Sequence, residues 1–105
     1  MSITIGYLQE YIKANDYRPE LKEKYFMKLA EEVGELSRAM RKDLRPVRDG
    51  DIKGTIDEEL WDVIYYAIAL ANCYGIDLEK AITLKERLNN EKYGDARKFE
   101  CTRVP

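Results

Sequence analysis

Two pairs of acidic residues have the spacing of a metal-binding or acid–base site. Glu32 and Glu35 form one pair in the segment KLAEEVGELSRAM, and Glu59 and Asp62 form the second in DEELWDVIYYAIAL. Residues three positions apart lie on the same face of a helix, so each pair presents two carboxylates in one direction. Asp62 also begins an otherwise apolar stretch, which predicts that the second pair borders the core.

Two such pairs on neighbouring helices can converge into one cage of oxygen ligands. Like charges raise each other's pKa values and partial burial raises them further, so the cage holds protons or a cation. A hard divalent ion fits these oxygens, which predicts Mg²⁺, with Mn²⁺ as the alternative. The competing interpretation is a set of ordinary surface carboxylates that pair with Lys28 or Arg38. We prefer it for Glu31 and Glu58, which lie further from the core.

The composition narrows the possible chemistry. The chain has 105 residues, 20 acidic and 18 basic, with a net charge of -2 and no histidine. The missing imidazole excludes Ser-His and Cys-His nucleophile pairs and His-ligated zinc. Proton transfer must therefore use carboxylates, amines, hydroxyls or a bound metal. Because the charge is nearly balanced, we expect no nucleic-acid partner.

The length predicts a single domain that covers residues 1–105. Cys73 and Cys101 are too few for a disulfide framework, and the N-terminus lacks the pattern of a signal peptide. No apolar run reaches the roughly 18 residues that a membrane span requires. We therefore predict a cytoplasmic protein with reduced thiols and no membrane association.

Apolar residues recur every three or four positions, which predicts an all-α fold with four helices. The expected ranges are about 5–14, 20–42, 55–74 and 78–93. Thr55 and Glu58 predict a capping box at the start of the third helix, and Gly75 predicts its end. The charged loop 43–54 and the tail 94–105 show no usable periodicity.

The apolar faces of the middle two helices indicate their partners. The second helix has a predicted apolar stripe of Phe26, Leu29, Val33, Leu36 and Met40. The third helix is apolar or aromatic throughout residues 60–74, except at Asp62 and Asn72. Such a helix in a small bundle is expected to pack against another subunit as well, which predicts a homo-oligomer. The alternative is a central helix wrapped by the other three within one chain.

The fourth helix changes character along one face. Its core-facing sector begins with Leu78, Ala81 and Ile82, and continues through Lys85, Asn89 and Lys92. A buried ammonium group needs a charged partner, so this change indicates a polar cavity in which an anion satisfies both lysines. Alternatively, the last two turns project beyond the bundle and leave both lysines in water.

These motifs together resemble the MazG-like nucleotide pyrophosphohydrolases, a family of all-α NTP pyrophosphatases. The family signature is E-x-x-E followed by E-x-x-D, and the resemblance is carried by EEVGELSRA, EELWDVIYYAIALANCYGIDLEKA and KERLNNEKY, over residues 28–93. It implies a fold like a four-helix bundle and assembly as a homodimer or homotetramer. It also implies Mg²⁺ binding by Glu32, Glu35, Glu59 and Asp62, and phosphate contacts by Lys85, Asn89, Lys92 and Tyr93.

Family members cleave nucleoside triphosphates between the α and β phosphorus atoms, which gives the monophosphate and pyrophosphate. We therefore expect a Mg²⁺-dependent pyrophosphohydrolase of NTPs or dNTPs, with a house-cleaning role if the nucleotides are non-standard. Glu32 or Glu35 is the expected proton acceptor. One alternative is a phosphoribosyl-ATP pyrophosphohydrolase, which shares the fold and the acidic motif. Another is a non-catalytic helical module that oligomerises or binds a nucleotide.

Overall fold

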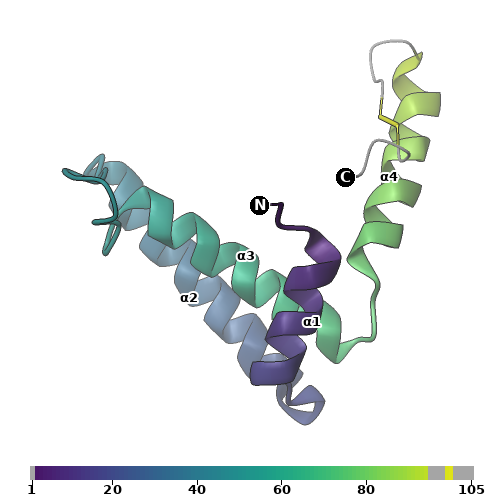
Figure 1. The fold of residues 1–105 in the computed structure, drawn as a ribbon, viewed down its shortest axis with the longest axis horizontal. Helices are drawn as coiled ribbons and strands as arrows, with labels where there is room; N and C mark the ends of the chain where they lie inside the picture. Colours follow the sequence, from purple (N-terminus) through teal and green to yellow (C-terminus); the bar gives the residue numbers. More distant parts are fainter. Residues whose placement is uncertain (1, 95–98, 101–105) are drawn as a thin grey trace.

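The computed structural model describes residues 2–94 and 99–100 of the chain. It contains four α-helices and one 3-10 turn: α1 (Ile5–Asn15), η1 (Pro19–Leu21), α2 (Lys22–Arg41), α3 (Ile56–Cys73) and α4 (Leu78–Tyr93). No strand occurs among the described residues. The all-α class and the four expected helices are thus confirmed (Figure 1).

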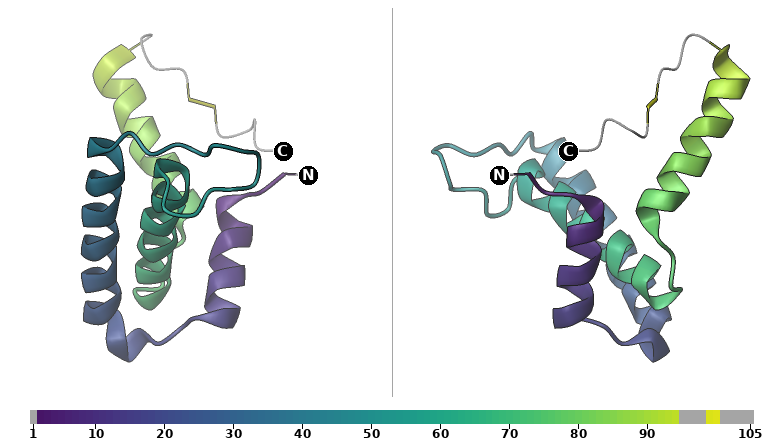
Figure 2. Two further views of the ribbon diagram at one scale, coloured as in Figure 1. Left: turned by 90° about the vertical axis from the view of Figure 1, so that its left-hand side faces the viewer. Right: turned by 45° about the vertical axis from the view of Figure 1, so that its right-hand side comes forward.

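The helices form an antiparallel pair with two outer elements. α2 and α3 lie side by side, and α1 packs across the C-terminal half of α3 (Figures 1 and 2). α4 packs against α1 at its N-terminal end and then runs away from the α2–α3 pair. Within one chain, α3 is therefore not wrapped by the other three helices. None of the helices in the described part of the chain has the length and apolar character that a membrane crossing requires.

The buried core is small and lies where α1, α2 and α3 meet. Its buried members are Ile12, Tyr25, Ile68 and Ala69. Leu8, Leu21, Tyr65, Tyr66, Leu70, Cys73 and Leu78 pack around them. Cys73 carries a free thiol. Cys101 and most of the tail lie outside the described residues.

The inward face of α2 differs from the predicted stripe. Tyr25 and Ala39 are buried, with exposed fractions of 7% and 3%. Leu29 and Leu36 are half-buried, as the stripe predicted. However, Phe26, Val33 and Met40 remain exposed. Each exposed residue directly follows a position on the inward face, so α2 is rotated by about one residue relative to the prediction.

An acidic side chain at the end of α1 explains this rotation. The Tyr25 hydroxyl of α2 donates a hydrogen bond to Asp16 Oδ1 at 2.7 Å. The Tyr65 hydroxyl of α3 donates to Asp16 Oδ2, also at 2.7 Å. Burial and these hydrogen bonds raise the pKa of Tyr25 to about 12 and raise that of Tyr65 as well. One carboxylate therefore joins three helices and holds Tyr25 on the inward face.

The buried Asn72 of α3 is part of a second polar junction. Its Nδ2 donates to the Gln9 carbonyl oxygen at 3.0 Å, and its Oδ1 accepts from Gln9 Nε2 at 3.0 Å. Gln9 Oε1 accepts in turn from the Leu78 N–H at 2.9 Å. Near the N-terminus of α1, the Gly6 N–H donates to Glu79 Oε2 at 2.6 Å. α1 thus connects α3 to the first turn of α4.

Both predicted boundary signals of α3 are present. Thr55 Oγ1 accepts from the Glu58 N–H at 3.4 Å, while Glu58 Oε1 accepts from the Gly54 N–H at 2.7 Å. The capping box therefore forms, with Gly54 in place of Thr55 as the backbone donor to glutamate. At the other end, Gly75 has a φ of 66° and its N–H donates to the Asn72 carbonyl at 3.0 Å. Such a left-handed residue ends a helix without the strain that a side chain would add.

We predict that the Asp16 junction makes the protein sensitive to alkali. The folded state binds more protons than the unfolded state between the ordinary tyrosine pKa of 10.0 and about 12, so the free energy of unfolding falls as pH rises through this range. Tyr25→Phe should destabilise the protein by about 2 kcal/mol at pH 8 and reduce its loss of stability above pH 10. Urea denaturation at pH 8 to 11 measures both effects.

The matched control is Tyr17→Phe, because the Tyr17 ring is 40% exposed and lies outside the core. This variant should keep the stability and pH dependence of the parent protein. Equal alkaline slopes for the parent and Tyr25→Phe would contradict the assignment.

Candidate metal centre

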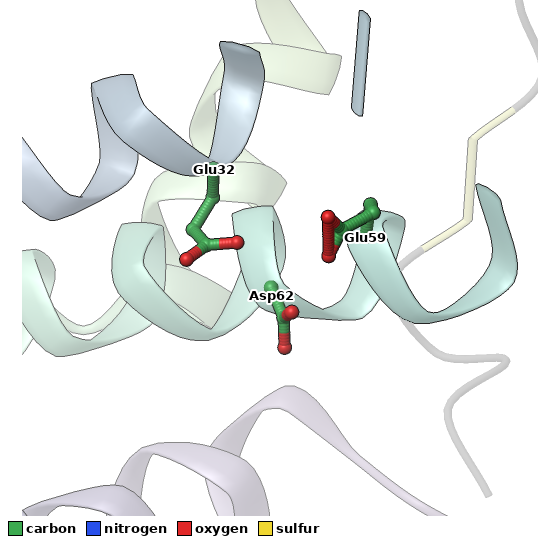
Figure 3. A group of neighbouring side chains, drawn as sticks. All are labelled: Glu32, Glu59 and Asp62. Atoms are coloured by element: carbon green, nitrogen blue, oxygen red, sulfur yellow. The ribbon is translucent and has the colours of Figure 1, made fainter. Parts of the chain in front are cut away.

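Three carboxylates meet between α2 and α3. Glu32 comes from α2, and Glu59 and Asp62 come from α3 (Figure 3). Each offers one carboxylate oxygen, and these three oxygens all lie within 4.8 Å of one another. Glu59 is buried, with 8% of its surface exposed, and the other two are half-buried. The group is therefore anionic and largely shielded from solvent.

The packing of α2 explains why Glu32 points inward. Tyr25 and Ala39 are both buried against the rest of the chain, and Glu32 lies seven residues from each. Seven residues complete nearly two turns, so all three side chains share one face of the helix. α3 then supplies the other two carboxylates from its first two turns, where the helix dipole favours negative charge.

The carboxylates raise one another's pKa values. The pKa of Glu59 rises to about 7, because burial disfavours its charged form and Asp62 both accepts a hydrogen bond from it and repels its negative charge. The pKa of Glu32 is also raised, first by burial and then by the charge of Asp62. At neutral pH the metal-free group therefore retains part of a proton, and a cation would relieve the repulsion.

The geometry fits a small oxygen-seeking cation. Mg²⁺ binds oxygen at about 2.0–2.1 Å in an octahedron, so its opposite ligands lie about 4.2 Å apart. The three oxygens, within 4.8 Å of one another, need only small side-chain movements to reach such distances. The donor set contains carboxylate oxygens alone, which suits Mg²⁺ or Mn²⁺ better than softer ions.

Glu35, the fourth predicted ligand, lies outside this group. It is exposed on α2, and its Oε2 lies 3.8 Å from Arg38 Nη1. Both side chains are more than half exposed, so this ion pair contributes little to stability. Glu35 is thus one helical turn from Glu32 and free to reorient.

The predicted phosphate-binding residues all lie in the second half of α4. Lys85, Lys92 and Tyr93 are exposed, and Lys92 Nζ lies 5.4 Å from the centroid of the Tyr93 ring. Asn89 Nδ2 donates a hydrogen bond to Glu86 Oε2 at 2.8 Å. Because this half of α4 runs away from α2 and α3, one chain does not bring these residues to the carboxylates (Figures 1 and 2).

Two further residues lie beside the carboxylates. Lys28 lies four residues before Glu32, and Tyr66 lies four residues after Asp62. In the antiparallel pair they face each other, with Lys28 Nζ 5.8 Å from the centroid of the Tyr66 ring. Their i, i+4 spacing from the two acidic residues is the signal that locates them.

Comparisons with known proteins agree with this architecture. The profile of the MazG nucleotide pyrophosphohydrolase domain matches residues 20–92. The crystal structure of N-tagged iMazG from Vibrio DAT 722 is 49% identical, with a TM-score of 0.80 over 88% of this chain and 99% of that chain. A C-tagged iMazG structure is 49% identical, with a TM-score of 0.78 over 84% of this chain and 99% of that chain.

No curated protein matches the chain. The matched domain nevertheless spans more than half of the sequence and includes all three converging carboxylates. The solved relatives share about half of their residues with this chain over nearly their whole length. The chain therefore belongs to the MazG family of nucleotide pyrophosphohydrolases and is a hydrolase that acts on nucleotides.

Proposed function

We propose that the protein is a Mg²⁺-dependent nucleoside triphosphate pyrophosphohydrolase that releases pyrophosphate and a nucleoside monophosphate. Its substrates would be NTPs or dNTPs, including non-standard ones, in the cytoplasm. The convergence of Glu32, Glu59 and Asp62 carries the proposal. A group of partly buried acids costs free energy in the empty state, and a metal–triphosphate substrate offsets that cost.

In this proposal Glu32, Glu59 and Asp62 hold the cation. When bound, Mg²⁺ supplies neutralisation of phosphate charge and makes water more acidic, and Mn²⁺ can take the same ligands. Burial of Glu59 fixes its carboxylate at the base of the site. The half-buried Glu32 and Asp62 leave the opposite side open to a phosphate chain.

Glu35 is the proton acceptor that we favour. The three clustered carboxylates would have their lone pairs committed to the cation, whereas Glu35 lies outside the cluster and is exposed. It can take a proton from water as the water oxygen bonds to phosphorus. The anhydride link between the α and β phosphorus atoms then breaks, and pyrophosphate leaves. Glu32 remains the alternative acceptor if one of its two carboxylate oxygens is not bound to the cation.

Assembly as a homodimer or homotetramer belongs to the same proposal. The chain exposes 8188 Å², whereas a folded monomer of 12.3 kDa exposes about 6,100 Å². Its radius of gyration is 16.1 Å, whereas about 13 Å is usual for this length. Phe26, Val33 and Met40 form an exposed apolar stripe along α2. Another subunit would cover these surfaces.

Assembly would also bring in the basic half of α4. We propose that Lys85, Asn89, Lys92 and Tyr93 contact the triphosphate from a neighbouring subunit. In that position the two lysines would offset the charge of the leaving pyrophosphate, and Asn89 would orient it.

We predict that metal affinity depends on pH. The folded, metal-free protein binds more protons than the unfolded chain between pH 4.5 and about 7, so Glu59 lowers the free energy of unfolding as pH rises through this range. A cation must displace this proton, so Mg²⁺ affinity should fall about tenfold for each pH unit below 7. Calorimetric titrations between pH 5.5 and 8 measure this slope.

Glu59→Gln should lose most Mg²⁺ binding at every pH, whereas Glu31→Gln should keep the affinity and the pH slope of the parent protein. Glu31 is the matched control because it is exposed and outside the carboxylate group. An affinity that is constant across this pH range would contradict the proposed site.

We predict catalytic losses at two acidic positions. Glu35→Gln should lower kcat at least about 100-fold through loss of the proton acceptor, and Asp62→Asn should do so through loss of a metal ligand. Pyrophosphate release from a panel of standard, deoxy, modified and phosphoribosyl-ATP substrates measures these effects, with Glu31→Gln as the control.

Turnover of phosphoribosyl-ATP alone would instead favour a phosphoribosyl-ATP pyrophosphohydrolase. If the parent protein with Mg²⁺ releases no pyrophosphate from any substrate, the catalytic proposal is wrong.

We predict that Val33→Asp disrupts the oligomer. Val33 is 49% exposed at the middle of the α2 stripe, where a buried charge would be costly. Light scattering after size-exclusion chromatography should give a multiple of 12.3 kDa for the parent protein and about 12.3 kDa for the variant. Val47→Asp is the control, because Val47 is 90% exposed in the loop between α2 and α3. A monomeric parent protein would refute the assembly.

A further inference from the structure

The junction between α3 and α4 sets the direction of α4, and one side chain of α1 spans this junction. Gln9 Nε2 donates hydrogen bonds to the Ile76 carbonyl oxygen at 2.8 Å and to Asn72 Oδ1 at 3.0 Å. Gln9 Oε1 accepts from the Leu78 N–H at 2.9 Å. Gln9 therefore binds the backbone on both sides of Asp77, the N-cap of α4.

The partners of Gln9 require an amide at this position. The Ile76 carbonyl can only accept a hydrogen bond, and the Leu78 N–H can only donate one. The Gln9 side chain carries a donor and an acceptor at its tip, so it satisfies both groups in a single orientation. A carboxylate would place a second acceptor against the Ile76 carbonyl, and an apolar side chain would satisfy neither group.

α4 is attached to the rest of its chain at its N-terminal end. Among the described helices, α1 makes the most contacts with α4. The second half of α4 runs away from α2 and α3 (Figures 1 and 2). One further hydrogen bond ties the first turn of α4 to α1, from the Gly6 N–H to Glu79 Oε2 at 2.6 Å. The bonds of Gln9 and Glu79 therefore decide where the helix points.

A small error in the direction of α4 becomes large at its basic end. Leu78 and Lys92 are 14 residues apart, which corresponds to about 21 Å along a helix. A tilt of about 10° at Leu78 would displace the far end by about 4 Å, which exceeds the length of a hydrogen bond. The positions of Lys85 and Lys92 in space thus depend on the bonds at the base of the helix.

We propose that Gln9 is a positioning residue, which holds α4 in the direction that brings Lys85 and Lys92 to the triphosphate of a neighbouring subunit. This role rests on the proposed function, in which these two lysines contact the phosphates. Gln9 lies outside the carboxylate group and acts through α4. Glu79 supports the same direction from the first turn of α4.

Residual dipolar couplings of backbone amides measure the direction of α4 relative to α2 and α3 in the full chain without substrate. Gln9→Met keeps the length of the side chain and removes its three hydrogen bonds. The couplings of residues 85–93 should change or average toward zero, whereas those of α2 and α3 should still fit one rigid pair. Asn15→Leu is the matched control, because the exposed Asn15 amide donates within α1, to the Tyr11 carbonyl oxygen at 2.8 Å.

Steady-state hydrolysis of the triphosphate that the parent protein cleaves fastest measures the functional effect. Gln9→Met should lower kcat/KM at least about tenfold, because misplaced contacts lose transition-state stabilisation. Its Mg²⁺ affinity should change less than about twofold, since the metal ligands lie between α2 and α3. In the Lys85→Gln/Lys92→Gln background, Gln9→Met should change kcat/KM less than about twofold, because the two ammonium groups that Gln9 positions are then absent.

Glu79 gives a second pair of variants at an exposed position, which tests the proposal even if Gln9→Met does not fold. Glu79→Ala removes the acceptor of the Gly6 N–H, whereas Glu79→Gln retains an oxygen that can accept this hydrogen bond. Glu79→Ala should therefore also lower kcat/KM, and Glu79→Gln should keep the parental value.

Three outcomes overturn the inference. The first is an unchanged direction of α4 in Gln9→Met, and the second is a changed direction with parental kcat/KM. The third is an equal loss of kcat/KM in the parent and the Lys85→Gln/Lys92→Gln backgrounds, which would indicate a purely structural role. The proposed function fails separately. If α4 changes direction in Gln9→Met but the parent protein hydrolyses no triphosphate, the catalytic proposal is wrong and Gln9 still directs α4.

Discussion

The face-to-face packing of α2 and α3 is the constraint on which the rest of the structure depends. Asp16 accepts hydrogen bonds from Tyr25 and Tyr65 and so fixes the rotation of both helices at one end. Ala39 closes the inward face of α2 near the other end. With both ends set, the helical period leaves Glu32 no position except opposite α3. The acidic centre is thus a direct consequence of how a small core is packed.

The packing of α2 against α3 places a stabilising core beside a destabilising group of carboxylates. The core near Tyr25 gains stability from apolar burial and from satisfied hydroxyl groups, whereas Glu32, Glu59 and Asp62 lose hydration and repel one another. Such repulsion between buried charges is typical of functional sites, where a bound ligand relieves it. The raised pKa of Glu59 reflects this burial and this repulsion between carboxylates in the metal-free protein.

α1 links the parts that the α2–α3 pair does not reach. Asp16 at its C-terminal end joins the core, while Gln9 and Gly6 bind α3 and the first turns of α4. These junctions position the start of α4 but leave its basic second half beyond the pair. The apolar stripe on α2 is likewise left uncovered within one chain. Both features have a common explanation if this chain is one subunit of a larger assembly.

The sequence by itself determined the helices, their boundaries and the identity of the acidic motif. Helical periodicity, the Thr55 cap and Gly75 are local signals, and local signals depend only on nearby residues. Only the tertiary structure decided which face of α2 is buried, because Phe26 and Tyr25 are equally suited to a core by composition. It decided that Glu32 joins Glu59 and Asp62 while Glu35 does not. The physical reason is that the rotation of a helix depends on contacts between residues far apart in the sequence. The hydrogen bond from Tyr65 to Asp16 is one such contact.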